Sequence, residues 1–175
     1  NDEYVYKYSG GLGTYPANHN PFSNYSAEED KTFFCYGGAD PSGNTLWHMV
    51  SYFDHKTGMV PKPTIVLDKQ TYNAHDNPVM NIDAEGFIWI FSTAHGTNSP
   101  SYIHKSKRPY DISEFEQVFA TKLEGGKTVE MNNFSYLQSW YQQGNGFINL
   151  FTYTVNIINQ IAACTWAANF IFITF

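Results

Sequence analysis

Short apolar runs bounded by glycine, proline and asparagine recur at close intervals along the chain. The runs 32–38, 87–93 and 147–151 are rich in aromatic and β-branched residues, which favour strands. Between two apolar runs, the segment 83–86 reads Asp-Ala-Glu-Gly and predicts a hairpin turn in which glycine supplies a positive φ. The pattern therefore predicts an all-β chain, with at most one short helical turn over 109–115.

These runs belong to a repeated unit. In each of three units a turn leads to an aromatic strand, and these strands contain Phe33, Phe87 and Phe147, which are 54 and 60 residues apart. In the first two units, two further runs with strand character follow, after a loop rich in glycine, serine or proline. About four short strands within such a period are typical of a propeller blade, whose faces pack against neighbouring blades. We expect a partial β-propeller domain over 1–175, with repeats at approximately 15–70, 71–128 and 129–175.

Net charge and cysteine content argue against several classes of protein. The formal net charge of −6 over 175 residues argues against a broad nucleic-acid surface. Cys35 and Cys164 lie in apolar runs without the spacing of a metal or redox motif, so we expect free thiols, no cofactor and no metal. A zinc site made of Cys35, His48 and His104 is the alternative. The apolar run 157–175 contains three amide side chains, which favours buried strands over a membrane span.

Two histidines flank the expected hairpin around 83–86. Because a hairpin folds the chain back on itself, His75 before its first strand and His95 after its second should lie near the same end. Two imidazoles in one pocket can supply a general base and a hydrogen-bond donor. The alternative for His75 is a turn-capping role beside Asn77, which His19 would share at the equivalent position of the first repeat.

The motifs of the second repeat resemble those of a known family. They are His-Asp-Asn-Pro from His75, Asp-Ala-Glu-Gly-Phe-Ile-Trp-Ile-Phe over 83–91, His95-Gly96 and Tyr-Ile-His-Lys-Ser over 102–106. Together they resemble the BNR-repeat propeller proteins, and more narrowly the branch that includes the seven-bladed ulvan lyases. The resemblance covers about residues 15–153. It implies three four-stranded blades of a larger, seven-bladed propeller that cleaves a uronate-containing acidic polysaccharide by β-elimination.

The resemblance also implies site residues. His75 and His95 match the two family histidines, and Tyr136 falls where these lyases have a catalytic tyrosine. The expected substrate-binding residues are Asn77, His19, Asn133 and Arg108. The chain departs from the family pattern near 152–154, where a neutralising arginine should follow, because Arg108 is its only arginine.

Other functions remain open at this stage. A sialidase needs several arginines to hold the substrate carboxylate, and one arginine argues against it. The missing arginine instead favours a non-catalytic glycan-binding propeller or an inactive truncated fragment as alternatives to the lyase. We expect an acidic polysaccharide as partner, no nucleic acid and no membrane, and a monomer if the propeller is complete. We expect a secreted or periplasmic protein whose signal peptide lies outside this sequence.

Overall fold

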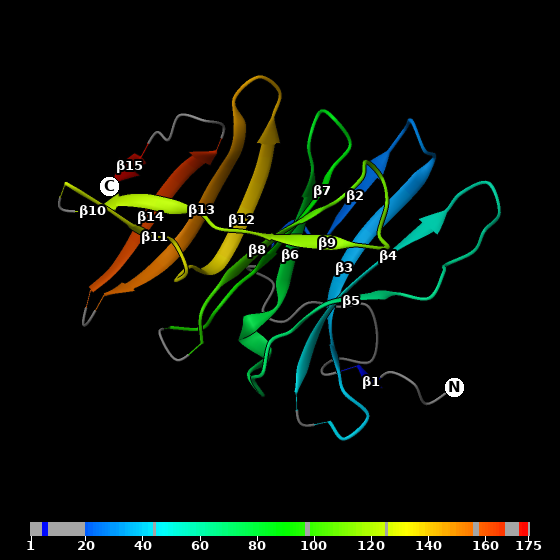
Figure 1. Ribbon diagram of the computed structural model, residues 1–175, viewed down its shortest axis with the longest axis horizontal. Helices are drawn as coiled ribbons and strands as arrows, with labels where there is room; N and C mark the ends of the chain where they lie inside the picture. The colour runs from blue at the N-terminus through cyan, green and yellow to red at the C-terminus, as the bar shows by residue number, and fades with distance from the viewer. Residues whose placement is uncertain are drawn as a thin grey trace.

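The computed structural model describes residues 20–43, 45–96, 99–124 and 126–155, together with the backbone of strands β1, β14 and β15 (Figure 1). The strands of the first sheet are β1 (Val5–Tyr6), β2 (Ser23–Ser26), β3 (Lys31–Ala39), β4 (Leu46–Asp54) and β5 (Thr64–Asp68). The second sheet contains β6 (Pro78–Ile82), β7 (Ile88–Ser92), β8 (Tyr102–Ser106) and β9 (Phe115–Val118). The third contains β12 (Ser135–Gln142), β13 (Gly146–Val155), β14 (Ile158–Trp166) and β15 (Phe172–Thr174). A hairpin of β10 (Thr121–Glu124) and β11 (Lys127–Glu130) links the second and third sheets.

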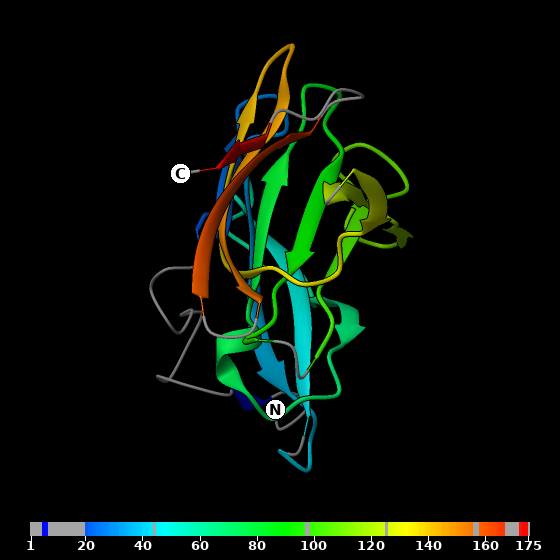
Figure 2. The same ribbon diagram turned by 90° about the vertical axis from the view of Figure 1, so that its left-hand side faces the viewer.

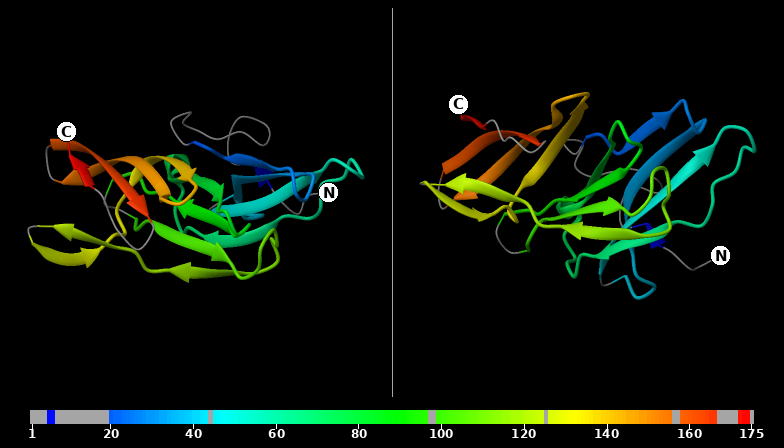
Figure 3. Two further views of the ribbon diagram at one scale, coloured as in Figure 1. Left: turned by 90° about the horizontal axis from the view of Figure 1, so that it is seen from above. Right: turned by 45° about the horizontal axis from the view of Figure 1, so that its top comes forward.

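All three sheets are built in the same way. Consecutive strands pair antiparallel, so each sheet is a meander of four neighbours, and in the first sheet β1 adds to the far end of β3. Figure 1 shows the sheets side by side, with the second sheet in the middle. Figure 3 shows from above how the hairpin of β10 and β11 lies to one side of the third sheet. The all-β expectation is confirmed by these antiparallel sheets.

Strand β7 packs against both neighbouring sheets. All five of its residues are buried, because sheets cover both of its faces. Ile88 and Ile90 pack with Phe33 of the first sheet, whereas Trp89 and Phe91 pack in the cluster that includes Phe147 of the third. Side chains of a strand alternate between its two faces, so one strand supplies two hydrophobic cores.

The first strands of the three sheets converge. The Met80 amide in β6 donates to the carbonyl of Pro21 at 2.9 Å, and the Ser139 amide in β12 donates to the carbonyl of Asn20 at 2.8 Å. The buried Asn81 side chain crosses from β6 to β12 and donates to Ser139 Oγ at 2.9 Å. Figure 2, turned by 90°, shows that the long strands of the sheets run in similar directions. These contacts fix β6 between the other two sheets.

Two local expectations can be compared with the backbone. The segment 109–115 forms turns rather than a helical turn, because Asp111 Oδ1 accepts from the Ser113 amide at 2.7 Å and closes a local loop. The one helical turn that the sequence allowed there does not form, and within the described residues the one short helix is η1 (Ala74–Asp76). The apolar run 157–175 contributes β14 and β15, as expected for strands. Among the described residues, no helix has the length and apolar character needed to cross a membrane.

Candidate functional site

Three segments gather at one edge of the second and third sheets. We call this the histidine edge: it consists of 69–77 with η1, which joins β5 to β6, of 93–101, which joins β7 to β8, and of the start of β12. Because β6 begins where β7 ends, both connections lie on the same side, toward the bottom of Figure 1. Strand order therefore places residues from three parts of the chain within reach of each other.

Three aromatic side chains meet at the histidine edge. The rings of His75 and His95 stack with centroids 4.7 Å apart and planes 27° apart. The Tyr136 ring stands edge-on to both, with its centroid 6.2 Å from that of His75 and 5.6 Å from that of His95. His95 is exposed, and His75 and Tyr136 are half-buried, so solvent reaches the group. The hairpin reasoning and the resemblance had indicated these three residues, and the structure brings them together.

Tyr136 has an unusual backbone. Its φ is 52°, in the left-handed region that non-glycine residues rarely adopt. The register between β12 and β13 shifts between Ser135 and Gln138, so Tyr136 occupies an irregularity in the strand. Bulges of this kind turn a side chain away from the direction that regular pleating would give it. The irregularity is what directs the Tyr136 ring toward the two imidazoles.

Hydrogen bonds join the 93–101 connection to the strand that carries Tyr136. The Gly96 amide donates to Ser135 Oγ at 3.1 Å, and the Ala94 amide donates to the Phe134 carbonyl at 3.0 Å. The buried Ser101 hydroxyl both donates to the Phe134 carbonyl and accepts from the Phe134 amide, each at 2.9 Å. These bonds hold His95 and Tyr136 in a fixed relation across two sheets.

Asn73 connects the two histidines. It caps the N-terminus of η1: its Oδ1 accepts from the His75 amide at 3.0 Å. The same oxygen lies 2.8 Å from His75 Nδ1, and Asn73 Nδ2 lies 3.3 Å from His95 Nδ1. One amide side chain thus contacts a ring nitrogen of each imidazole.

Two buried charged groups lie behind the rings. The Asp76 carboxylate accepts from the His95 amide and from the Thr71 side chain, and Lys69 donates to the carbonyl of Pro100. Asp76 is 2% exposed and Lys69 is 4% exposed. Burial raises the pKa of Asp76, opposed by the nearby Lys69 ammonium, and burial lowers the pKa of Lys69 to about 8. Through these hydrogen bonds, both buried groups anchor the 93–101 connection that carries His95.

The expected substrate-binding residues do not lie together in the structure. Asn77 is 4% exposed and packs so closely on Gly37 of the first sheet that a Cβ there would lie 2.1 Å from Asn77 Oδ1. Asn133 is half-buried, and its Oδ1 makes no hydrogen bond within the described part of the chain. Arg108 lies at the opposite edge, bonded to Asp111 at 2.7 Å, and the structure does not bring it to the histidines. His19 lies outside the described residues.

The residues of the alternative zinc site are dispersed. His48 Nδ1 lies 2.7 Å from Ser92 Oγ in the buried contact between the first and second sheets. His104 is buried on β8, and burial lowers its pKa. Cys35 is a free, buried thiol in the core with Phe33, and burial raises its pKa. Over the described residues, no three histidine, cysteine or acidic side chains gather as a metal site.

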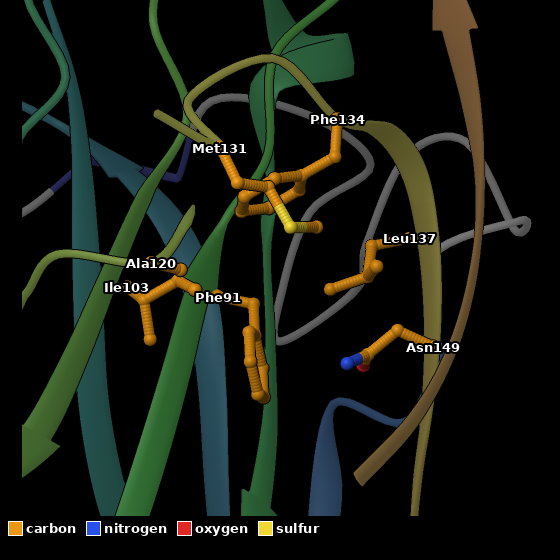
Figure 4. A pocket seen from close by; sticks show the side chains of 7 residues that line it. All are labelled: Phe91, Ile103, Ala120, Met131, Phe134, Leu137 and Asn149. Carbon is orange, nitrogen blue, oxygen red and sulfur yellow. The ribbon is translucent and has the colours of Figure 1, made fainter. Parts of the chain in front are cut away.

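A small apolar cavity lies between the second and third sheets, away from the histidines. Figure 4 shows the side chains that line it: Phe91, Ile103, Ala120, Met131, Phe134, Leu137 and Asn149. Asn149 is the polar member, and its Oδ1 makes no hydrogen bond among the described residues. The cavity belongs to the packing of the core and contains none of the expected catalytic side chains.

Comparison with known proteins assigns no family. No protein-family model matches the chain. No curated protein is similar to it in sequence.

Reasoning from sequence missed Asn73, Asp76 and Lys69. A signal for Asn73 was present, since asparagine two residues before His75 fits an N-cap that accepts from the His75 amide. Asp76 was read as part of the His-Asp-Asn-Pro motif, and Lys69 follows β5 without any motif. Their burial depends on packing between sheets, which no local pattern reveals.

Proposed function

We propose that the histidine edge is the active site of a lyase that cleaves a uronate-containing acidic polysaccharide by β-elimination. One imidazole removes the C5 proton, the C–H electrons form the C4–C5 double bond, and the C4–O bond breaks. Tyr136 donates a proton to the departing oxygen, and N–H groups face the uronate carboxylate. A general base and a general acid in one site are the requirement of this reaction.

The observation that carries this proposal is the convergence of His75, His95 and Tyr136. Their ring centroids lie within 4.7 to 6.2 Å of one another, although they come from three separate segments. Tyr136 reaches the group through a left-handed φ of 52°, and backbone strain of this kind occurs often at functional sites. Imidazole and phenol are side chains that serve as general bases and general acids, and solvent reaches this group.

We further propose that the three sheets are blades of a β-propeller. Each contains a four-strand antiparallel meander, and β6 contacts both β2 of the first sheet and β12 of the third. Three sheets are fewer than the four to eight blades with which propellers close. The proposed protein is secreted or periplasmic, where an extracellular polysaccharide is accessible.

A non-catalytic glycan-binding module is the second candidate. The observation that favours it is the position of Arg108, the only arginine of the sequence, at the edge opposite the histidines. The Lys69 ammonium, which bonds to the 93–101 connection, is buried. The imidazole N–H groups must therefore neutralise the substrate carboxylate if the protein is a lyase.

The test is an assay of the full chain on a panel of uronate-containing polysaccharides that includes ulvan, following the ultraviolet absorbance of unsaturated uronate. His75→Ala and His95→Ala should each lower the rate by at least about 100-fold, the usual size of a general acid–base contribution. His55→Ala is the matched control, because His55 is an exposed histidine beside Thr32, away from the site.

Binding of the same polymers by calorimetry separates the two candidates. Unsaturated product that disappears in both site variants supports the lyase. Saturable binding without unsaturated product overturns the lyase and supports the binding module. Equal loss of activity in His55→Ala and the site variants would show that the losses reflect folding rather than chemistry.

A further inference from the structure

The orientation of the Asn73 amide is determined by a backbone group. The His75 amide N–H can only donate, so the Asn73 atom 3.0 Å away must be the oxygen. The other end of the side chain is therefore the NH₂ group, which can only donate. This end lies 3.3 Å from His95 Nδ1.

The amide orientation in turn determines the proton positions of both neutral rings. Asn73 Oδ1 is an acceptor, so His75 Nδ1, 2.8 Å away, must carry a proton. Asn73 Nδ2 is a donor, so His95 Nδ1 must carry a lone pair and the proton of that ring lies on Nε2. Two imidazoles stacked at 4.7 Å are thereby held in opposite tautomers.

We propose that Asn73 is a positioning residue that fixes His75 as the Nδ1–H tautomer and His95 as the Nε2–H tautomer. The Nε2 atom of His75 then bears a lone pair, and that of His95 bears a proton. This assignment rests on the proposed function where it names roles: His75 serves as the base, and His95 donates to the substrate carboxylate. The tautomers themselves follow from Asn73 alone.

The surroundings keep Asn73 in place. Its backbone N–H donates to Thr71 Oγ1 at 3.1 Å, and the Thr71 side chain also bonds to the buried Asp76 carboxylate. Asp76 accepts from the His95 amide, so the backbone of His95 is held by the segment that holds Asn73. An Asn73 side chain fixed at both ends can impose opposite tautomers, whereas a mobile one would average them.

The experiment is nitrogen NMR of the full chain labelled on its histidine rings, at a pH where the rings are neutral. Chemical shifts of Nδ1 and Nε2 report directly which nitrogen carries the proton. In the wild type, we expect His75 as Nδ1–H and His95 as Nε2–H, with signals assigned by His75→Ala and His95→Ala. A wild-type His75 in the Nε2–H form, the form preferred in water, overturns the proposal.

Substitutions at Asn73 sharpen the test. Asn73→Ala should return His75 to the Nε2–H form. Asn73→Asp keeps an N-cap acceptor but has no donor, so it should switch His95 to Nδ1–H and leave His75 as Nδ1–H. Asn145→Ala, in the exposed turn between β12 and β13, is the control and should change neither ring. Unchanged tautomers in both Asn73 variants would contradict the proposal.

An activity measurement distinguishes this inference from the proposed function. On a polysaccharide that yields unsaturated product, Asn73→Ala should lower kcat by at least about tenfold with little change in KM, because a wrong tautomer impairs chemistry rather than binding. A switched tautomer with unchanged kcat would overturn the positioning role. If no polymer yields product, the proposed function fails while the NMR result still decides the tautomers.

Discussion

Two tyrosines with left-handed backbone lie at opposite edges of the molecule, and their surroundings differ. At the histidine edge, Tyr136 has a φ of 52° and its ring stands edge-on to two imidazoles. At the other edge, which we call the arginine edge (27–30, 83–87 and 107–114), Tyr110 has a φ of 54°. The Tyr110 hydroxyl donates to Glu28 at 2.9 Å, and a Cβ at Gly86 would lie 2.5 Å from its ring.

The charged groups of the two edges differ in their exposure to solvent. At the arginine edge, Arg108 bonds to Asp111 at 2.7 Å and Lys107 lies 3.6 Å from Glu114, in pairs that reach solvent. At the histidine edge, Asp76 and Lys69 are buried behind half-buried or exposed rings. A strained backbone alone therefore does not mark a functional site. What distinguishes the histidine edge is that buried charged groups lie behind imidazole and phenol side chains that solvent reaches.

The largest expected effect on stability is that of Asp76→Ala. The substitution leaves the Lys69 ammonium buried without its neighbouring carboxylate and removes the acceptor of the His95 amide. Leaving a buried ammonium without a nearby carboxylate costs about 3 kcal/mol. Urea unfolding at pH 7 should show this loss, whereas Glu114→Ala, which removes an exposed ion pair at the arginine edge, should change the midpoint too little to measure. Equal effects at both edges would contradict the comparison.

A smaller effect is expected for Ser101→Ala. The Ser101 hydroxyl is both donor and acceptor for the backbone of Phe134, and its loss leaves two buried backbone groups without that partner. The expected destabilisation is about 2 kcal/mol. Ser113→Ala, an exposed serine at the arginine edge, is the control and should cost less than about 0.5 kcal/mol. Urea unfolding of the two variants gives the difference.

Over a single pH unit, the pH dependence of stability is the smallest of these effects. Burial lowers the pKa of Lys69 to about 8 in the folded protein. Between this pH and the ordinary lysine pKa, Lys69 is protonated in the unfolded chain but largely neutral in the folded one. Stability therefore rises with pH across this window, and the gain is lost as pH falls through about 8. The slope is at most about 1.4 kcal/mol per pH unit. Lys69→Met should remove this slope, and a variant with the wild-type slope would contradict the burial of the charge.

Much of this arrangement could be predicted from local patterns. The turn 83–86 and its flanking runs predicted a hairpin, and hairpin pairing alone implies that His75 and His95 lie near one end. Strand composition likewise located several strands to within one or two residues, as for β8 (Tyr102–Ser106). These features depend on neighbours in the chain, which is why a single sequence reveals them.

Contacts between sheets could not be predicted. Asn77 was expected to bind substrate, but it packs on Gly37, which belongs to another sheet. The position of Arg108, by contrast, follows from the direction of β8. This strand begins beside Ser92, near the histidine edge, and therefore ends at the opposite edge, where Arg108 follows it. The contact of Asn73 with both histidines depends on its side-chain conformation and on the path of the 93–101 connection. The spacing of residues along the sequence therefore could not predict it.

The most direct test of the account compares the two left-handed tyrosines in one assay. Tyr136→Phe and Tyr110→Phe each remove a single hydroxyl and keep the ring, and both proteins are assayed for unsaturated uronate on the polymer that the wild type cleaves. The account predicts that Tyr136→Phe slows product formation by about 100-fold or more and that Tyr110→Phe stays within about twofold of wild type. A Tyr136→Phe protein as active as Tyr110→Phe would contradict the assignment of catalysis to the histidine edge.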